Sequence, residues 1–194
     1  YSFTPWLMPW DLYLYPAALI LALPLVGLVH RMARHPVDRI YLLSTLIRFS
    51  LAFMMFLYGL SKVLLEQFAL SYSDQDVRLL NASGAVKAWS FFGHSDTYQA
   101  FLGWGEVVGA LMILFHATLP VGALLLAVML VNIALANFTH DIGVRANSTL
   151  YLMQALLLIW PDRVRIVQFM AGKTAEPRSL PEVACRWRVP LNLG

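Results

Sequence analysis

No charged residue interrupts VGALLLAVMLVNIALA, residues 121–136 of the chain. The charge-free region around it extends from just after Glu106 to just before Asp141. An apolar run of about 18 or more residues can cross a bilayer as a helix. Over all 194 residues, 59% are apolar and 13% are charged, with a mean hydropathy of +0.65, whereas soluble domains carry roughly a quarter of their residues as charged ones. The composition predicts an all-α, polytopic membrane helix bundle and excludes a soluble enzyme and a disordered tail.

Four further apolar runs predict membrane spans, so that we expect five in all. They lie at about Leu12–Val29, Ile40–Leu65, Tyr98–Phe115 and Ser148–Trp160. The polar stretch 66–97 still contains aromatic residues, which favours a short helix at the membrane interface. Pro161 suits the first position of another amphipathic helix, which we expect to run through Phe169. The chain therefore divides into an extra N-terminal span with a basic loop (residues 1–39), a membrane core (40–170) and an extended tail (171–194).

Lysine and arginine are distributed unevenly among the loops. Arg31, Arg34 and Arg39 follow the first span. The same side of the membrane would hold Arg163, Arg165, Lys173, Arg178, Arg186 and Arg188. Because short cytoplasmic loops carry the excess of basic residues, we expect the N-terminus outside and the C-terminal tail in the cytoplasm.

Two classes of partner and site are excluded by composition. The net charge of +3 comes from residues beside the spans, so it predicts no nucleic-acid partner. The single cysteine, Cys185, excludes an internal disulfide and a cysteine-rich metal site.

Glu106 is the clearest case of an ionisable residue inside a predicted span. An ionisable side chain at such a depth costs about 2.5–3.5 kcal/mol on insertion scales and usually faces the interior of the bundle beside a partner. Gly105 and Gly109 have the small-xxx-small spacing that lets another helix approach closely, so we expect them to pack helices and Glu106 to be buried. Its carboxylate could hold a proton or a ligand, or it could lock two helices through an ion pair.

Few cations lie near the level of Glu106. Lys62 lies near the outer end of the second span and can reach Glu106, pair with Glu66 one turn later, or extend outward to the interface. Arg48 lies nearer the cytoplasmic side of the same span, where we expect it to reach the anionic headgroups.

The densest polar group, NFTHDIGVR at residues 137–145, follows the fourth span. Because each isolated charge at this depth is penalised by several kcal/mol, we expect the nearby polar side chains to share one cavity below the outer surface. The side chains expected to converge are Lys62, Glu106, His140, Asp141 and Arg145, and Asn137 is expected within reach of Lys62 and Glu106. No two of them have metal-ligand spacing on one helix, so no metal site is predicted.

A capped turn is the alternative interpretation of the same segment. In it, Asn137 ends the fourth span, and Asn147 or Ser148 starts the fifth.

Several short segments in order resemble the DoxX-like family of bacterial integral membrane proteins. The resemblance covers about residues 40–169 and rests on Tyr58-Gly-Leu-Ser-Lys62, Gln67-Phe68, Trp89-Ser-Phe-Phe-Gly93, Gly105-Glu106 and Asn137-Phe-Thr-His-Asp-Ile-Gly-Val-Arg145. It departs from the family pattern at His140, Ile142, Gly143 and Arg145, where members more usually have Tyr, Val, Pro and Lys.

The resemblance implies a four-helix core, to which this chain adds its first span, in the bacterial inner membrane. It implies an integral membrane subunit or assembly factor of a larger complex, respiratory or redox in kind, with the bilayer and other membrane subunits as partners. The alternative is the membrane component of a quinone-linked oxidoreductase with an outer-side polar site around Glu106, for which the implied cofactor is a quinone. A small-molecule transporter is disfavoured because the chain lacks paired inverted halves.

Overall fold

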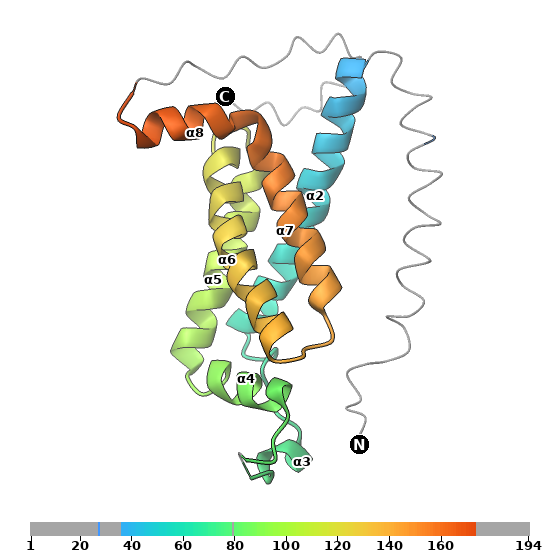
Figure 1. Ribbon diagram of the computed structural model, residues 1–194, viewed down its shortest axis with the longest axis vertical. Coiled ribbons are helices and arrows are strands. Elements are labelled where there is room, and N and C mark those ends of the chain that lie inside the picture. The colour runs from blue at the N-terminus through green and yellow to red at the C-terminus, as the bar shows by residue number, and fades with distance from the viewer. Residues whose placement is uncertain (1–26, 28–35, 79, 174–194) are drawn as a thin grey trace. The chain divides into compact units, whose positions relative to one another are not determined.

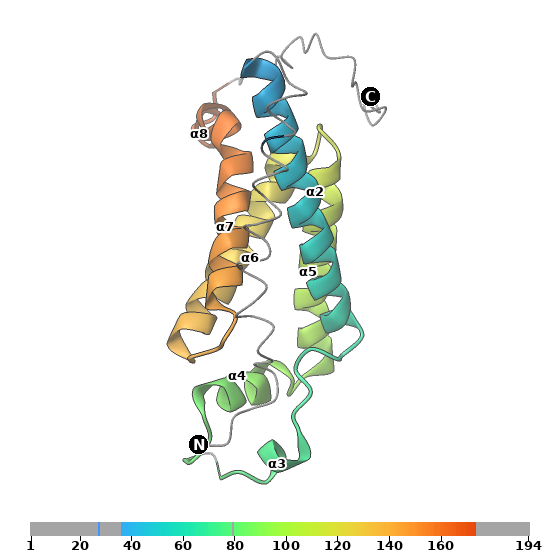
Figure 2. The ribbon, with the colours of Figure 1, turned by 90° about the vertical axis from the view of Figure 1, so that its right-hand side faces the viewer.

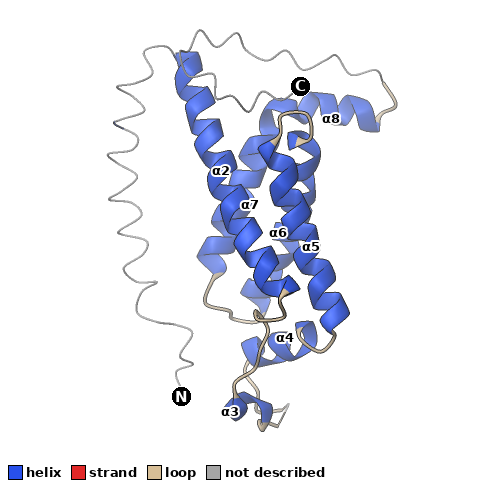
Figure 3. Cartoon of the chain, turned by 180° about the vertical axis from the view of Figure 1, so that it is seen from behind, coloured by secondary structure: helices blue, strands red, loops and turns tan. Residues whose placement is uncertain are grey.

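The computed structural model describes residue 27 and residues 36–78 and 80–173 (Figure 1). Every regular element in this part of the chain is a helix (Figure 3), which confirms the all-α prediction. The elements are α2 (Pro36–Val63), α3 (Tyr72–Gln75), α4 (Gly84–Phe92), α5 (Asp96–Leu114), α6 (Leu119–Thr139), α7 (Arg145–Ile159), the 3-10 helix η1 (Trp160–Asp162) and α8 (Arg163–Met170). Apart from Gly27 and residues 171–173, the predicted first span and the predicted tail lie outside the described residues.

The chain divides into two compact units. The first holds residues 1–45 and 180–188, and the second holds residues 46–179 and 189–194. In the first unit, the described backbone includes the beginning of α2, where the Thr45 hydroxyl donates to the carbonyl oxygen of Tyr41 at 2.8 Å. The hydrophobic core and the candidate site both belong to the second unit.

In the second unit, α2 from residue 46 onward runs side by side with α5, α6 and α7 as a bundle (Figure 1, Figure 2). The short helices α3 and α4 lie beyond one end of this bundle, and α8 turns sideways beyond the other end (Figure 1). The predicted interfacial helices therefore correspond to α4 and α8, and the four predicted core spans correspond to the four long helices.

The helix boundaries differ from the predicted ones at the turn between α6 and α7. α6 continues through Thr139, so the polar segment 137–145, expected to follow the fourth span, is a loop only over residues 140–144. Asp141 turns the chain there with a left-handed φ of 55°. Besides glycine, aspartate is one of the few residues that adopt this conformation as a single residue. The turn at Asp141 reverses the chain within a few residues, so the loop is shorter than the polar segment suggests.

The predicted capping of this turn is wrong. Asn137 lies inside α6, whose C-cap is His140. The N-cap of α7 is Val144, which makes no side-chain capping bond, and Asn147 and Ser148 lie within the helix. These polar side chains are therefore available for contacts inside the bundle.

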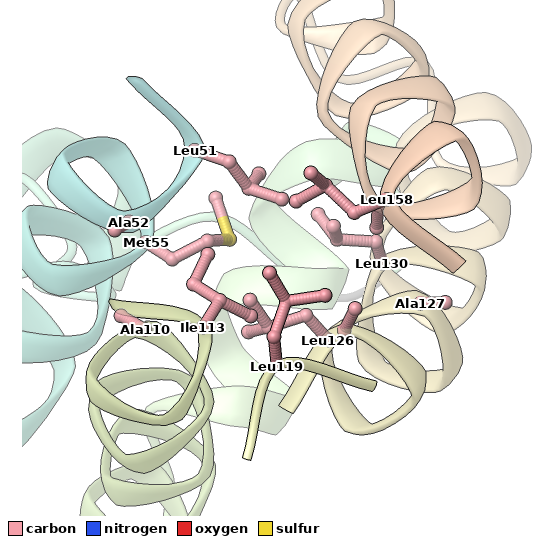
Figure 4. Close-up of a cluster of buried hydrophobic side chains, with 12 residues drawn as sticks. Leu51, Ala52, Met55, Ala110, Ile113, Leu119, Leu126, Ala127, Leu130 and Leu158 are labelled. Atoms are coloured by element: carbon pink, nitrogen blue, oxygen red, sulfur yellow. The ribbon is translucent and has the colours of Figure 1, made fainter. Parts of the chain in front are cut away.

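The hydrophobic core occupies the part of the bundle nearer α8, where α5 ends, α6 begins and α7 ends (Figure 4). Its buried side chains are Leu51, Ala52, Met55, Ala110, Ile113, Leu119, Ala123, Leu126, Ala127, Leu130, Ala155 and Leu158. Several alanines among them let the helices approach closely.

Glycines bring α2 and α5 into backbone contact. A Cβ atom on Gly59 would lie 2.7 Å from the carbonyl oxygen of Gly103, and one on Gly103 would lie 2.5 Å from that of Gly59. The glycines singled out in the sequence, Gly105 and Gly109, instead face Met129 and Leu126 of α6. Both seams of α5 thus depend on residues without a side chain.

Within the described part of the chain, two helices are long and apolar enough to cross a membrane, namely residues Arg39–Val63 of α2 and Leu119–Thr139 of α6. The outward face of α6 is strongly apolar: Val128 is 65% exposed, Leu135 60% and Phe138 59%.

Candidate functional site

Lys62 and Glu106 form an ion pair inside the bundle. The Lys62 Nζ donates to both carboxylate oxygens of Glu106, at 2.6 Å to Oε1 and 2.7 Å to Oε2. Their side chains are only 6% and 1% exposed. The pair joins the last turn of α2 to the middle of α5, so the Lys62 side chain turns inward toward Glu106 and does not extend to the interface.

The glycine contact explains why these two charges meet. Gly59 lies three residues before Lys62, and Gly103 lies three residues before Glu106. Residues three apart share a helix face, so the face on which the two backbones touch also carries the two charges. The helices are close enough there for a short lysine-to-carboxylate contact.

A cavity of about 430 Å³ opens beside the ion pair, between the four long helices and α4. Its lining is mostly apolar, with Lys62, Glu106 and a few neutral polar side chains in the wall. The polar members besides the ion pair are Tyr58, Ser61, Gln67, Asn132, Asn137, Asn147, Ser148 and Tyr151. Cavities of this size and character commonly hold small organic ligands, which the few polar groups orient.

Aromatic side chains close the end of the cavity next to α4. The ring of Phe68 packs edge-on against Trp89 at 5.4 Å and stacks on Phe92 at 5.3 Å, measured between centroids. The first turn of α4 is stabilised by its N-cap Ser83, whose hydroxyl accepts from the backbone N–H of Val86. The amphipathic helix predicted from its sequence thus forms a wall of the cavity.

Asn137 lines the cavity with an unused hydrogen-bond donor. The residue is 5% exposed, and its side-chain Nδ2 is buried without a hydrogen-bond partner among the described residues. Its backbone is satisfied on the C-terminal side, where the N–H of Ile142 donates to the Asn137 carbonyl at 3.0 Å. Buried donors are nearly always paired in native proteins, so this amide points to a group that the described residues do not supply.

The cavity reaches the molecular surface on α6. Val128 and Asn132 both line it and are both exposed. They are four residues apart and therefore lie on one face of the helix. The apolar outer face of α6 thus borders the opening.

Three of the predicted cluster residues lie away from this cavity. Asp141 and Arg145 pair with each other at 2.9 Å across the turn, with side chains 83% and 44% exposed. The Nδ1 of His140 lies 3.1 Å from the carbonyl oxygen of Ala136. The expectation that His140, Asp141 and Arg145 share the cavity is wrong: Asp141 and Arg145 are exposed, His140 lies against the last turn of α6, and none of the three lines the cavity.

Arg48 is buried, whereas the sequence predicts that its side chain extends to the headgroups at the membrane surface. It is 3% exposed, and its Nη1 lies 3.0 Å from Nε2 and 3.4 Å from Nδ1 of His116. His116 lies in the turn between α5 and α6. Its contact with Arg48 could not be predicted, because the sequence does not indicate that this turn lies beside α2.

The sequence reasoning also missed Tyr58, Phe68 and Tyr151 as cavity residues. Tyr58 and Tyr151 approach each other across the bundle with ring centroids 6.2 Å apart. Tyr58 was detectable, since it lies four residues before Lys62 on the same helix face.

The described residues contain no group of three or more His, Cys, Asp or Glu side chains arranged to hold a metal ion.

Sequence comparison identifies a relative in Bacillus subtilis (strain 168), the uncharacterized protein YwoB. The two chains are 35% identical over 133 residues, which is 69% of this chain and 85% of YwoB. No family model matches the chain. No solved structure matches it.

Proposed function

The chain belongs to the same family as YwoB of Bacillus subtilis, and for this family member we propose an integral membrane protein that binds an amphipathic ligand of the quinone class. The observation that carries the proposal is the buried Lys62–Glu106 pair in the wall of a cavity of about 430 Å³ whose lining is otherwise uncharged and mostly apolar. Intramembrane ionisable residues are costly and commonly mark a functional site.

The membrane setting is supported by the surface of the bundle. Among the described helices, α2 and α6 are long and apolar enough to span a membrane, and we propose that α5 and α7, which run beside them, cross the bilayer as well. With the first span predicted from residues 12–29, this gives five spans. The uneven distribution of lysine and arginine supports an outer N-terminus and a cytoplasmic tail in a bacterial inner membrane.

The ligand class follows from the chemistry of the cavity wall. An apolar lining suits a hydrocarbon body, and the opening beside the apolar face of α6 suits a ligand that arrives from lipid. An ammonium group has three N–H donors, of which Glu106 takes two from Lys62, so one remains for a head-group oxygen. A quinone held there would supply reversible two-electron redox chemistry, and the resemblance to the DoxX-like family, some of whose members are quinone-linked, agrees with this choice.

We also propose that the protein is a subunit of a larger respiratory or redox complex. A quinone-binding membrane subunit needs a partner that exchanges electrons with the quinone. The features that favour such a partner are the extra first span and the proline-spaced tail of residues 171–194, which lie almost entirely outside the described residues.

Quenching of Trp89 fluorescence tests the proposed function, because Trp89 lines the cavity. The full chain, with its other tryptophans changed to Phe, is placed in lipid nanodiscs and titrated with decylubiquinone. We expect saturable quenching, and we expect the apparent Kd to rise by about tenfold or more, the equivalent of about 1.4 kcal/mol, in the double variant Lys62→Met, Glu106→Leu.

Two controls keep this result specific. Glu66→Gln removes an exposed carboxylate near the end of α2 and should leave the Kd unchanged. A matched variant keeps Trp104 of α5 as its single tryptophan and carries Trp89→Phe; because Trp104 does not line the cavity, it should show no saturable quenching, and it reports any quenching by free quinone. Quenching that rises linearly with quinone and never saturates would refute the proposed function.

A further inference from the structure

We propose that the Asn137 side-chain amide is the residue that selects and orients the ligand, and that the ligand is a neutral molecule with an oxygen acceptor on an apolar body. This inference rests on the proposed binding function and deepens it. It comes from two buried features of the cavity wall: an ion pair whose charges cancel, and an amide donor without a partner among the described residues.

The unpaired side-chain N–H of Asn137 can be satisfied by a hydrogen-bond acceptor on a ligand. Its Nδ2 lies in a residue that is 95% buried and faces the cavity. Leaving a buried donor unpaired costs about 1–3 kcal/mol, and a ligand oxygen of the carbonyl or ether type would remove that cost. A hydrocarbon without oxygen would not, so the amide discriminates between two ligands of equal size and similar apolar area.

The ion pair sets the charge of the ligand. Both carboxylate oxygens of Glu106 accept from Lys62 Nζ, so the two charges cancel within the wall. A charged ligand would be buried without a counter-charge. If Lys62 or Glu106 left the pair to neutralise the ligand, the other residue would remain as a buried charge without a partner, at a cost of several kcal/mol. The cavity therefore favours a neutral ligand over an anion or a cation.

Gln99 provides an internal comparison for Asn137. It is also a buried amide, 2% exposed, with an Nε2 that has no hydrogen-bond partner among the described residues. It lies on α5 and does not line this cavity. Replacing either residue by leucine removes a buried amide of similar size, but only the change at Asn137 removes one that a ligand can reach.

The test uses three probes of matched length in the full chain: decylubiquinone, decylbenzene and 4-decylbenzoate. Quinone binding is followed by Trp89 quenching, and the other two are measured by displacement of the quinone. For wild type we expect decylubiquinone to bind most tightly and decylbenzoate least tightly. Asn137→Leu should weaken decylubiquinone about tenfold, as expected for the loss of one hydrogen bond in a buried site, and leave decylbenzene unchanged, whereas Gln99→Leu should change neither.

Infrared spectroscopy supplies a readout that a purely structural role would not move. The carbonyl stretch of ¹³C-labelled quinone should shift to lower frequency in wild type and return toward its free value in Asn137→Leu. Since that variant also removes an unpaired buried donor, its thermal midpoint in the absence of ligand should not fall, which shows that the fold is kept. If Asn137→Leu does unfold, the shorter donor variant Asn137→Ser is compared with Asn137→Ala in the same way.

The outcomes separate this inference from the proposed function. Equal quinone affinity in wild type and Asn137→Leu, or tightest binding by decylbenzoate, would overturn the inference while leaving the cavity a quinone site. Absence of saturable binding by wild type would overturn the proposed function, and with it the role of Asn137.

Discussion

Lys62 and Glu106 are each buried only because the other is present. Inside a bundle, an ion pair with both carboxylate oxygens hydrogen-bonded offsets most of the loss of hydration, whereas a single charge does not. The geometry observed, 2.6 and 2.7 Å from one ammonium to two oxygens, is the kind that allows this. The coupling between the two residues can be measured directly.

We expect Glu106→Leu alone and Lys62→Met alone each to lower the free energy of unfolding by about 3–5 kcal/mol, because each leaves a buried charge without a partner. The double variant should lie close to wild type, because two apolar side chains of similar volume need no partner. Reversible unfolding in mixed detergent micelles measures all four proteins.

Arg145→Met is the matched control for this cycle, because it breaks an ion pair of similar length that is exposed. Its effect should stay below about 1 kcal/mol. Additive effects of the two single changes at Lys62 and Glu106 would show that the pair is not coupled.

The residues of the site were predictable to different degrees. The meeting of Lys62 and Glu106 follows from the cost of leaving either one alone, and that cost is visible in the sequence. Whether His140 and Asp141 point inward depends on a turn of few residues with one left-handed φ, which composition does not reveal. The same turn keeps Asn137 inside α6, so a residue expected to cap the helix lines the cavity.

The seam between α2 and α5 depends on a different property, the absence of side chains at Gly59 and Gly103. A methyl group at either position would meet the backbone of the other helix, which cannot swing away as a side chain can. The seam between α5 and α6 at Gly105 is more tolerant, because its nearest atoms are the end of the Met129 side chain, at 2.9 and 3.0 Å.

We therefore expect Gly103→Ala to destabilise the bundle by about 1–3 kcal/mol, as overpacking does, and to weaken quinone binding by spreading the helices that hold the ion pair. Gly105→Ala should cost less than about 1 kcal/mol, since Met is readily repacked. Unfolding in mixed micelles compares the two variants. A larger loss in Gly105→Ala would contradict the seam as described.

The long helices could be predicted from the sequence because apolar runs of that length have few other structures open to them. The position of α4 could not. Its amphipathic pattern shows that one face is apolar, but the contact of Trp89 and Phe92 with Phe68 joins segments that no periodicity relates. The aromatic wall of the cavity is therefore visible only in three dimensions.

For the molecule as a whole, the proposed membrane orientation can be tested by thiol labelling. Cys185 lies in the tail, outside the described residues, and should be protected from a membrane-impermeant maleimide in intact cells. In Cys185→Ser, Asn81→Cys, the new thiol should react, because Asn81 is exposed in the loop before α4, on the side proposed to face outward. Labelling only after permeabilisation for Asn81→Cys, and before it for Cys185, would reverse the orientation.

The contact of Gly59 with Gly103 also determines which helices of the bundle can move apart transiently. Sliding α2 along α5 would drive backbone against backbone and pull Lys62 from Glu106, so these two helices must fluctuate together as one rigid body. Nearer α8, Gly122 of α6 lies against the backbone of α5, but beside the cavity α6 meets Gly105 of α5 through the flexible end of the Met129 side chain. We therefore expect the transient opening that admits a ligand in the part of α6 beside the cavity. Amide hydrogens in the middle of α2 should accordingly exchange with solvent more slowly than those of α6 beside Asn132.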